Sequence, residues 1–476
     1  MDEVLTTPVS PTLASPGPDS DKDATAQANG ESDATQTARG PQAPKDPSEI
    51  GLPQGFLPNL IIKILYVRGA LSGDRLSSLI RLPFWAIEDD LETFQKRKLV
   101  EVLRSEGMGR RGYVFDLTTE GRNRARTLMQ VQPYTGPAPV SLDQYAEWVE
   151  RQSIRTPYVG PELVEKGLSH LVLDAETIEL VGPAINSALS MFLYGEAGNG
   201  KSTLAEAIIN IFTDEIFIPY AIHADGQVIQ LFDPVTHTPV DDDVPTDDEE
   251  AQGPIMFPPP SYDRRFIRIK RPLIIVGGEL TLDQLELRWD ANSGAYQAPP
   301  QMKANGGIFV IDDFGRQRLH PRELLNRWMY PLDRGEDFLT FNSGRRAAIP
   351  FAPFVVFATN MDPFELVEEA FLRRIRYKIE IKSPNKEEFT EIFRRLCRIH
   401  GVEFQQSAVD FIYLQYYIRY GIAPRGCHPR DLLRDLIDYA AFLGRPPSLS
   451  EDMLDHSCRS YFMSLQQMNE AHRHDA

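Results

Sequence analysis

The sequence predicts an α/β protein in which a doubly wound parallel sheet is followed by a small helical domain. Between residues 155 and 383, short apolar runs typical of buried strands alternate with helical patterns, which predicts a parallel sheet covered by helices on both faces. The strand-like runs are residues 191–194, 307–311, 354–358 and 376–381. After Pro384 no strand pattern is evident, and a helical domain is predicted over residues 384–468. Its four predicted helices are residues 386–400, 407–420, 428–443 and 450–465.

Length and composition restrict the class of protein. The chain has 476 residues, which suits two or three domains, and a net charge of −18, which argues against a surface that binds nucleic acid throughout. No apolar stretch approaches the roughly 20 residues of a membrane-spanning helix, and no secretory signal is visible at the N-terminus. The three cysteines are scattered without metal-ligand spacing. We therefore expect a cytoplasmic protein that does not insert into membranes.

Two segments have compositions that do not favour packed structure. Residues 1–50 contain no Phe, Trp or Tyr, so residues 1–52 are predicted to form a disordered tail. Residues 241–260 hold seven acidic residues and a Pro-Pro-Pro run, which predicts a mobile acidic loop within the α/β region. Residues 131–154 carry several prolines and are interpreted as a connector that contains one helix, residues 142–152.

Residues 53–130 show a regular order of predicted elements. Helices are predicted at residues 57–69, 73–80 and 83–98, strands at 99–103 and 112–117, and a further helix begins near residue 117. This order resembles that of a winged helix. Thirteen Lys and Arg against nine Asp and Glu, with Arg110 and Arg111 in the wing, favour contact with DNA phosphates. The third helix, however, is expected to expose Asp89 and Glu92 beside Thr93 and Lys96, and carboxylates repel the DNA backbone. DNA binding and protein contact or a purely structural role both stay open, and the carboxylates favour the second.

The strongest functional pattern is MFLYGEAGNGKST at residues 191–203. Gly195, Gly200, Lys201 and Ser202 have the GxxxxGKS spacing, with an apolar strand before them and a helical pattern after them. Glycines let the backbone turn so that N–H groups point at phosphate oxygens, to which the helix N-terminus adds partial positive charge. Lys201 is predicted to reach the β- and γ-phosphates, and the Ser202 hydroxyl to ligate Mg²⁺. The predicted nucleotide-binding residues are Gly195, Glu196, Ala197, Gly198, Asn199, Gly200, Lys201, Ser202 and Thr203.

A second polar cluster follows the apolar run 308–311, which ends at Asp312 and Asp313. A buried parallel strand ends at the carboxyl edge of its sheet, where ligands of open α/β sheets bind. We expect Asp312 to hold Mg²⁺ directly or through water. Asp313, one residue farther on, is predicted to orient and deprotonate the attacking water.

Together with PFVVFATNMDP at residues 353–363, these two patterns resemble the AAA+ ATPases, and the resemblance covers residues 155–465. It implies ATP and Mg²⁺ as ligands and Asn360 as the sensor-1 residue that positions the lytic water. It also implies an arginine finger, Arg374 or failing it Arg373, that reaches the nucleotide of a neighbouring subunit. Arg430, in GCHPRDLL, matches the sensor-2 arginine. Because the finger acts between subunits, the resemblance implies a homo-oligomer, most simply a hexameric ring.

Two features depart from the family pattern. Members usually carry Asp-Glu where this chain has Asp312 and Asp313, and the shorter second carboxylate would hold the water about one methylene farther away. In addition, 111 positions separate Lys201 from Asp312, which is long for the family. The extra material, residues 214–305, includes a hairpin-like stretch at 220–232, the acidic loop and a basic run at 264–271. Insertions of this kind often face the substrate in the family.

The leading functional hypothesis is an ATP-hydrolysing motor that remodels a macromolecular client, most simply a protein. Two alternatives stay open. One is a nucleotide-dependent DNA-binding regulator or loader that uses the winged helix to contact DNA. The other is an ATP-gated switch with negligible turnover, which the Asp at position 313 favours.

Overall fold

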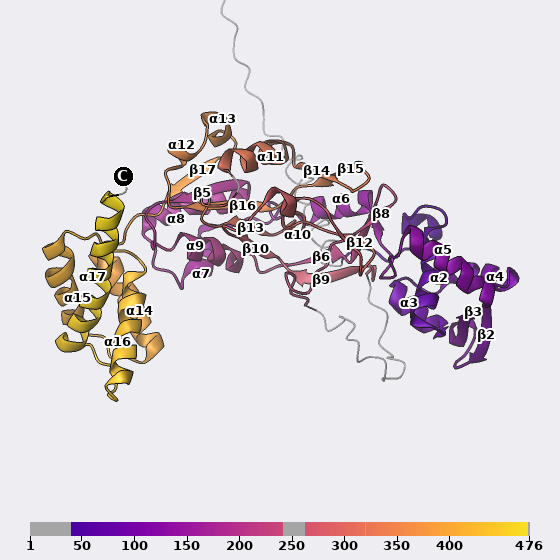
Figure 1. The fold of residues 1–476 in the computed structure, drawn as a ribbon, viewed down its shortest axis with the longest axis horizontal. Coiled ribbons are helices and arrows are strands. Elements are labelled where there is room, and N and C mark those ends of the chain that lie inside the picture. Colours follow the sequence, from indigo (N-terminus) through magenta and orange to yellow (C-terminus); the bar gives the residue numbers. More distant parts are fainter. Residues whose placement is uncertain (1–39, 241–261, 319, 475–476) are drawn as a thin grey trace, which may run out of the picture.

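The computed structural model describes residues 40–240, 262–318 and 320–474. The acidic loop predicted at residues 241–260 therefore lies outside the described residues. Figure 1 shows three parts along the longest axis of the molecule. An N-terminal domain lies at one end, two larger sheets and their helices lie in the middle, and a helical domain lies at the other end.

The middle part contains the predicted parallel sheet, with strand order β10-β13-β16-β5-β17. Every neighbouring pair in it is parallel. Its central strands are apolar and buried along most of their length, as expected for strands covered on both faces. The edge strand β10 was not among the predicted strands. The bounds are β10 (Leu273–Val276), β13 (Ile308–Ile311), β16 (Phe354–Thr359), β5 (Ser190–Tyr194) and β17 (Tyr377–Glu380).

Alternate residues of these strands pack into two separate apolar clusters, one on each face of the sheet. Ile308 and Val310 face one cluster, whereas Phe309 and Ile311 face the other. The first cluster also contains residues of α7 (Pro161–Leu168), α8 (Ala175–Ser187), α9 (Lys201–Ala207) and η3 (Ile208–Ile211). The second contains residues of η5 (Leu282–Leu285), α11 (Pro321–Arg334) and α13 (Glu369–Leu372), next to α12 (Pro363–Leu366).

The N-terminal domain consists of helices around a three-stranded antiparallel sheet of order β1-β3-β2. The elements that were predicted lie within two residues of their expected bounds, and the short strand β1 was not predicted. The bounds are α2 (Phe56–Arg68), β1 (Leu71–Ser72), α3 (Gly73–Ile80), α4 (Trp85–Lys96), β2 (Val100–Ser105), η2 (Arg110–Gly112), β3 (Tyr113–Leu117) and α5 (Thr119–Val131).

A second sheet, of order β11-β12-β8-β7-β4, lies between the parallel sheet and the N-terminal domain (Figure 1). Most of it comes from the extra material at residues 214–305, and we call this part the insertion domain. It includes the hairpin expected at residues 220–232. The sheet strands are β4 (Val140–Ser141), β7 (Ala221–Ala224), β8 (Gln227–Gln230), β11 (Arg288–Asp290) and β12 (Ala295–Gln297). The pairs β6 (Glu215–Pro219) with β9 (Phe266–Lys270) and β14 (Glu336–Thr340) with β15 (Arg346–Pro350), and the helix α10 (Pro300–Lys303), complete it.

The structure differs from the predicted connector at residues 131–154. Strand β4 pairs in parallel with β7, and α6 (Leu142–Arg151) packs into the apolar core of the insertion domain. Tyr145, Trp148 and Val149 lie three and four positions apart, so one face of α6 is apolar and buried. The prolines made this segment look like a linker, but it is part of a packed domain.

Two arginines of the basic run at residues 264–271 are buried within the insertion domain. Arg265 is 1% exposed and pairs with Asp263 at 2.7 Å, while Arg271 is 5% exposed and pairs with Asp214 at 2.6 Å. Buried arginines need a carboxylate and hydrogen-bond acceptors to offset the loss of water. These two therefore hold the insertion domain together.

The predicted disordered tail, residues 1–52, is wrong for its last part. Residues 40–52 are described, and they include the short helix η1 (Pro47–Ile50), which Asp46 caps. The Asp263 amide donates to the Pro41 carbonyl at 2.6 Å, and the Arg265 guanidinium donates to the Ile50 carbonyl at 2.6 Å. These contacts use backbone carbonyls, which every residue type offers, so composition does not reveal them.

The helical domain has an apolar cluster of its own, formed by residues of all its helices. Its helices are α14 (Lys386–His400), α15 (Gln406–Ile412) continued by the π-helical turn η6 (Tyr413–Ile418), α16 (His428–Phe442) and α17 (Glu451–His474). Across the described ranges, none of the helices combines the length and apolar character needed to cross a lipid bilayer.

Candidate nucleotide site

The phosphate loop links β5 to α9, at the carboxyl edge of the parallel sheet. Gly195, Gly198 and Gly200 have φ values of 132°, 86° and 85°, a region that side chains rarely tolerate. A Cβ atom at Gly195 would lie 2.5 Å from the Ile381 carbonyl oxygen, so the loop also passes too close to β17 for any other residue. The motif glycines thus allow the chain to turn directly into α9, which begins at Lys201.

Lys201 is 6% exposed and reaches the end of the neighbouring strand β16. Its Nζ donates to the Gly195 and Glu196 carbonyls, both at 2.9 Å, and to Asn360 Oδ1 at 2.6 Å. Burial lowers the pKa of Lys201, and nearby carboxylates, with Asp312 first among them, oppose that shift. The predicted phosphate-binding lysine and the predicted sensor-1 residue therefore contact each other.

Ser202 and Asp312 meet at the same edge. The Ser202 hydroxyl donates to Asp312 Oδ1 at 2.7 Å, and the Asp313 amide donates to the same oxygen at 3.0 Å. A hydroxyl and a carboxylate oxygen are the kind of hard ligand that Mg²⁺ prefers, with the remaining positions left to phosphate and water. The pair fits the Mg²⁺ site predicted from the sequence.

Asp313 follows directly and has an exposed side chain with φ of 48°. Its Oδ1 accepts a hydrogen bond from the Asn360 amide at 3.1 Å. Asn360 therefore bridges Lys201 and Asp313, using its oxygen for the first and its nitrogen for the second. The sequence-predicted loop, metal ligand, water-activating carboxylate and polar sensor lie in one connected network.

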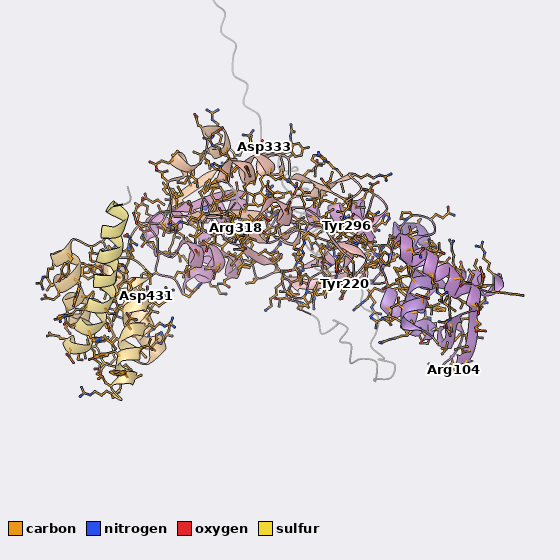
Figure 2. All side chains as sticks on the ribbon, in the orientation of Figure 1. Arg104, Tyr220, Tyr296, Arg318, Asp333 and Asp431 are labelled. Carbon is orange, nitrogen blue, oxygen red and sulfur yellow. The ribbon has the colours of Figure 1, made fainter. Side chains whose placement is uncertain are left out.

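The two candidate finger arginines contact residues outside this network. Arg374 pairs with Asp333, near the end of α11, at 2.6 Å and is 29% exposed. Arg373, directly after α13, pairs with Glu369 at the start of that helix and is 75% exposed. Figure 2 shows Asp333 on the upper side of the middle part.

The helical domain contacts the phosphate loop through a residue that was not predicted. Arg430, the predicted sensor-2 arginine, is 67% exposed and bonds to the adjacent Asp431 at 3.0 Å. Arg425 instead pairs with Glu196 of the loop at 3.4 Å, and its charge contributes to the lowered pKa of Lys201. The sequence does not distinguish Arg425 from Arg430 as the arginine that contacts the phosphate loop, because both lie close to the same Gly-Cys turn.

Residues next to Arg425 bond to the loop backbone and to Asn199. The Cys427 amide donates to the Gly198 carbonyl at 2.8 Å, and the Gly426 amide donates to Asn199 Oδ1 at 3.3 Å. Asn199 Nδ2 in turn donates to the Ser383 hydroxyl, just before α14, at 3.2 Å. The predicted nucleotide-binding residue Asn199 thus connects the phosphate loop to the helical domain through Gly426 and to the segment that precedes α14 through Ser383.

Comparisons with known proteins add little to this geometry. A family model described as a domain of unknown function (DUF8689) matches residues 385–460, which is most of the helical domain. A comparison with curated protein sequences gives no match.

Among solved structures, a mutant of RuvB from Thermotoga maritima is similar with 16% identity, 64% of this chain and 71% of that chain covered, and a TM-score of 0.33. NtrX from Brucella abortus is similar with 12% identity, 60% and 56% covered, and a TM-score of 0.35. Domain III of the replication initiation protein DnaA from Thermotoga maritima has 11% identity, 64% and 99% covered, and a TM-score of 0.35. These overall similarities are weak, so the functional argument depends on the residues of the site.

Proposed function

We propose that this chain binds ATP with Mg²⁺ and hydrolyses it as an AAA+ motor. The observation that carries the proposal is the 2.7 Å contact between Ser202 and Asp312, at the end of the loop that also carries Lys201. Residues 110 positions apart in the sequence meet there, as a phosphate loop and its metal-holding carboxylate must. A chance match of the GxxxxGKS spacing does not explain this meeting.

Each residue of the network has a distinct task in the proposed reaction. The loop N–H groups and Lys201 hold the phosphates, while Ser202 and Asp312 hold Mg²⁺. Mg²⁺ held by these two side chains would neutralise the negative charge that develops during phosphoryl transfer. Asp313 accepts the proton of the attacking water, and the Asn360 amide orients that water against the γ-phosphate.

The proposal extends to a homo-oligomer, most simply a hexameric ring. Arg373 and Arg374 are adjacent residues directly after α13, and their side chains pair with Glu369 and Asp333. A planar guanidinium supplied by a neighbour would stabilise the transferring phosphoryl group. The Arg374 side chain is partly exposed, so it could leave its ion pair with Asp333 and contact the nucleotide of a neighbouring subunit.

We propose a protein, rather than DNA, as the client. In the N-terminal domain, Arg110 of the loop between β2 and β3 pairs with Glu92 of α4 at 2.9 Å and approaches Glu88 at 3.6 Å. Arg110, one of the two wing arginines expected to contact DNA phosphates, is thus already paired with carboxylates on the helix that would enter the groove. A DNA-binding regulator is the alternative, and salt-sensitive binding of a duplex by the full chain would favour it.

The experiment that tests the proposal is steady-state ATP hydrolysis against protein concentration. The parent is compared with Lys201→Ala, Arg374→Ala and Arg373→Ala, together with ATP binding by each. We expect specific activity to rise with concentration, Lys201→Ala to lose ATP binding, and one arginine variant to bind ATP but lose about 10³-fold or more in turnover. A parent that hydrolyses ATP at constant specific activity, with both arginine variants intact, contradicts the ring with a finger supplied by a neighbour.

An ATP-gated switch is the second candidate, because Asp313 is shorter than the usual Glu. If the parent binds ATP but shows no turnover at any concentration, the motor proposal fails and the switch replaces it. The variant Asp313→Glu then provides a direct comparison. If Asp313→Glu hydrolyses ATP and the parent does not, the absence of turnover in the parent is due to the shorter side chain at position 313.

A further inference from the structure

The turn after β13 carries Asp313 and is closed by one side chain, Gln317. Its Nε2 donates to the Asp312 carbonyl at 3.0 Å and to the Asp313 carbonyl at 3.2 Å. Its Oε1 accepts from the Gly315 amide at 2.8 Å. A single half-buried amide therefore satisfies three backbone groups of a turn only a few residues long.

This turn needs such support because its backbone is unusual at two positions. Asp313 has φ of 48°, in the left-handed region that residues other than glycine adopt infrequently, although Asp tolerates it better than most. Gly315 has φ of 101°, and a Cβ there would lie 2.9 Å from Leu366. Conformations of this kind persist when surrounding contacts determine them.

The same turn is attached to the end of β16, where Asn360 lies. The Phe314 amide donates to the Ala358 carbonyl at 2.8 Å, and the Thr359 hydroxyl donates to the Phe314 carbonyl at 2.7 Å. With Gln317 on the other side, the turn is held from both directions. The Asp313 carboxylate then reaches the Asn360 amide at 3.1 Å.

We propose that Gln317 is the positioning residue that aims Asp313 at the attacking water, an inference that rests on the proposed ATP hydrolysis. A Glu has an additional side-chain torsion with which to adjust its carboxylate, whereas the position of an Asp carboxylate is set mainly by its backbone. The shorter carboxylate of this chain therefore depends on the conformation of the turn. Gln317 fixes that conformation by bonding the two carbonyls on either side of the Asp313 backbone.

The isosteric variant Gln317→Glu separates this role from simple packing. The Glu side chain keeps an oxygen that can accept a hydrogen bond from the Gly315 amide. It replaces the Nε2 donor, however, with a second oxygen, which faces the Asp312 and Asp313 carbonyl oxygens. Gln317→Ala removes all three hydrogen bonds. Gln130→Glu, on the exposed surface of α5, introduces the same charge far along the chain and serves as the control.

The test measures single-turnover ATP hydrolysis and, separately, ATP affinity in the full chain. We expect Gln317→Glu to lower the hydrolysis rate about 10- to 100-fold, as small misplacements of reacting groups do, with ATP affinity within about threefold of the parent. In an Asp313→Ala background, Gln317→Glu should cause no further loss, because the carboxylate it positions is gone. An equal loss in both backgrounds would overturn the inference.

A second readout does not need hydrolysis. Hydrogen exchange at the Gly315 amide, measured without added nucleotide, should be faster in Gln317→Ala and close to the parent in Gln317→Glu and Gln130→Glu. Equal exchange in all four proteins would mean that Gln317 does not hold the turn. A parent without turnover overturns both the proposed function and this inference, whereas a parent that hydrolyses ATP as fast as Gln317→Glu overturns this inference alone.

Discussion

The N-terminal domain and the helical domain are attached to the middle of the molecule in different ways. Ala221, Val228 and Ala295 of the insertion domain belong to the same buried apolar cluster as α2, α3 and α4. The Phe56 ring also packs edge-on against His223 of β7, with centroids 5.2 Å apart. The helical domain, in contrast, buries its apolar residues in a cluster of its own, and its polar contacts to the phosphate loop come from residues 425–427.

This difference indicates which domain can move with the nucleotide. Separating a shared apolar core exposes surface at about 25 cal/mol per Å², and nothing replaces the lost contacts. A few hydrogen bonds to the phosphate loop, each worth about 1 kcal/mol net, can be exchanged for water or ligand. With ATP bound as proposed, we expect the helical domain to respond to the nucleotide, while the N-terminal domain follows the insertion domain as one body.

The largest expected effect comes from breaking the attachment of the N-terminal part. Arg265 pairs with Asp263 and donates to the Ile50 and Pro139 carbonyls, all within a buried site. Removing one partner of a buried ion pair leaves the other charge without compensation, so Arg265→Ala should lower the free energy of unfolding by about 3–5 kcal/mol. Urea denaturation followed by tryptophan fluorescence measures the change, because Trp148 is buried in the same domain.

An arginine three residues later in the chain supplies the control. Arg268 of β9 pairs with Glu215 at 3.2 Å, and its side chain is 37% exposed. An exposed pair contributes about 0–1 kcal/mol, so Arg268→Ala should unfold close to the parent. Similar losses in the two variants would show that burial of Arg265 does not determine the attachment.

The next effect concerns the helical domain and its dependence on pH. His428 is 2% exposed and accepts a hydrogen bond from the Arg425 amide at 3.2 Å. Burial, with Arg425 nearby, lowers the pKa of His428 to about 4, against about 6.5 in the unfolded chain. As pH falls from 6.5 to 4, the unfolded state binds a proton that the folded state does not, so the helical domain should lose up to about 3 kcal/mol of stability.

The variant His428→Gln tests that assignment, because Gln keeps an acceptor but does not titrate. Its stability between pH 6.5 and 4, followed by thermal melting, should fall less than that of the parent. A parallel decline of both proteins would assign the acid sensitivity to other groups.

A smaller effect is expected where the helical domain contacts the loop. Asn199→Ala removes the acceptor of the Gly426 amide and the donor to Ser383, which should weaken the contact by about 1–2 kcal/mol. Hydrogen exchange of the Gly426 amide should become several-fold faster while the exchange of the N-terminal domain stays unchanged. Faster exchange in both domains would contradict their independent attachment, and Asn123→Ala on the exposed face of α5 is the control.

The phosphate loop and the acidic strand could be predicted because each is a local pattern. GxxxxGKS fixes the loop, and an apolar run ending in Asp312 fixes a strand terminus, so the parallel sheet brings them together without further information. Asn360 follows from the next strand for the same reason. Gln317 was not predicted, because its partners are backbone groups of a turn and no sequence pattern predicts the conformation of that turn.

Contacts between segments that are far apart in the chain could also not be predicted from the sequence. Arg425 lies 229 positions from Glu196, and Arg430 offered an equally plausible match five residues later. In the insertion domain the strands are two to five residues long and are separated by loops of uneven length, so alternation was too short to identify more than one hairpin. Its core depends on α6 and on residues 40–52, which compositional bias had assigned to a connector and a tail.

The smallest expected effect should stay within the N-terminal domain. Asp90 of α4 is half-buried, and burial together with the neighbouring Asp89 raises its pKa to about 6, against about 3.9 in the unfolded chain. Between pH 4 and 6 the folded state therefore retains a proton that the unfolded state loses, and stability falls as pH rises through this window. At pH 7.5 Asp90→Asn should stabilise the domain by at most about 1 kcal/mol after screening by solvent, and the gain should vanish below pH 4.

Because the N-terminal and insertion domains share a core, the amides of both domains should exchange hydrogen more slowly in Asp90→Asn, whereas the exchange of the helical domain should not change. A gain that is confined to α4, or one that extends to the helical domain, would contradict the contrast between the two attachments.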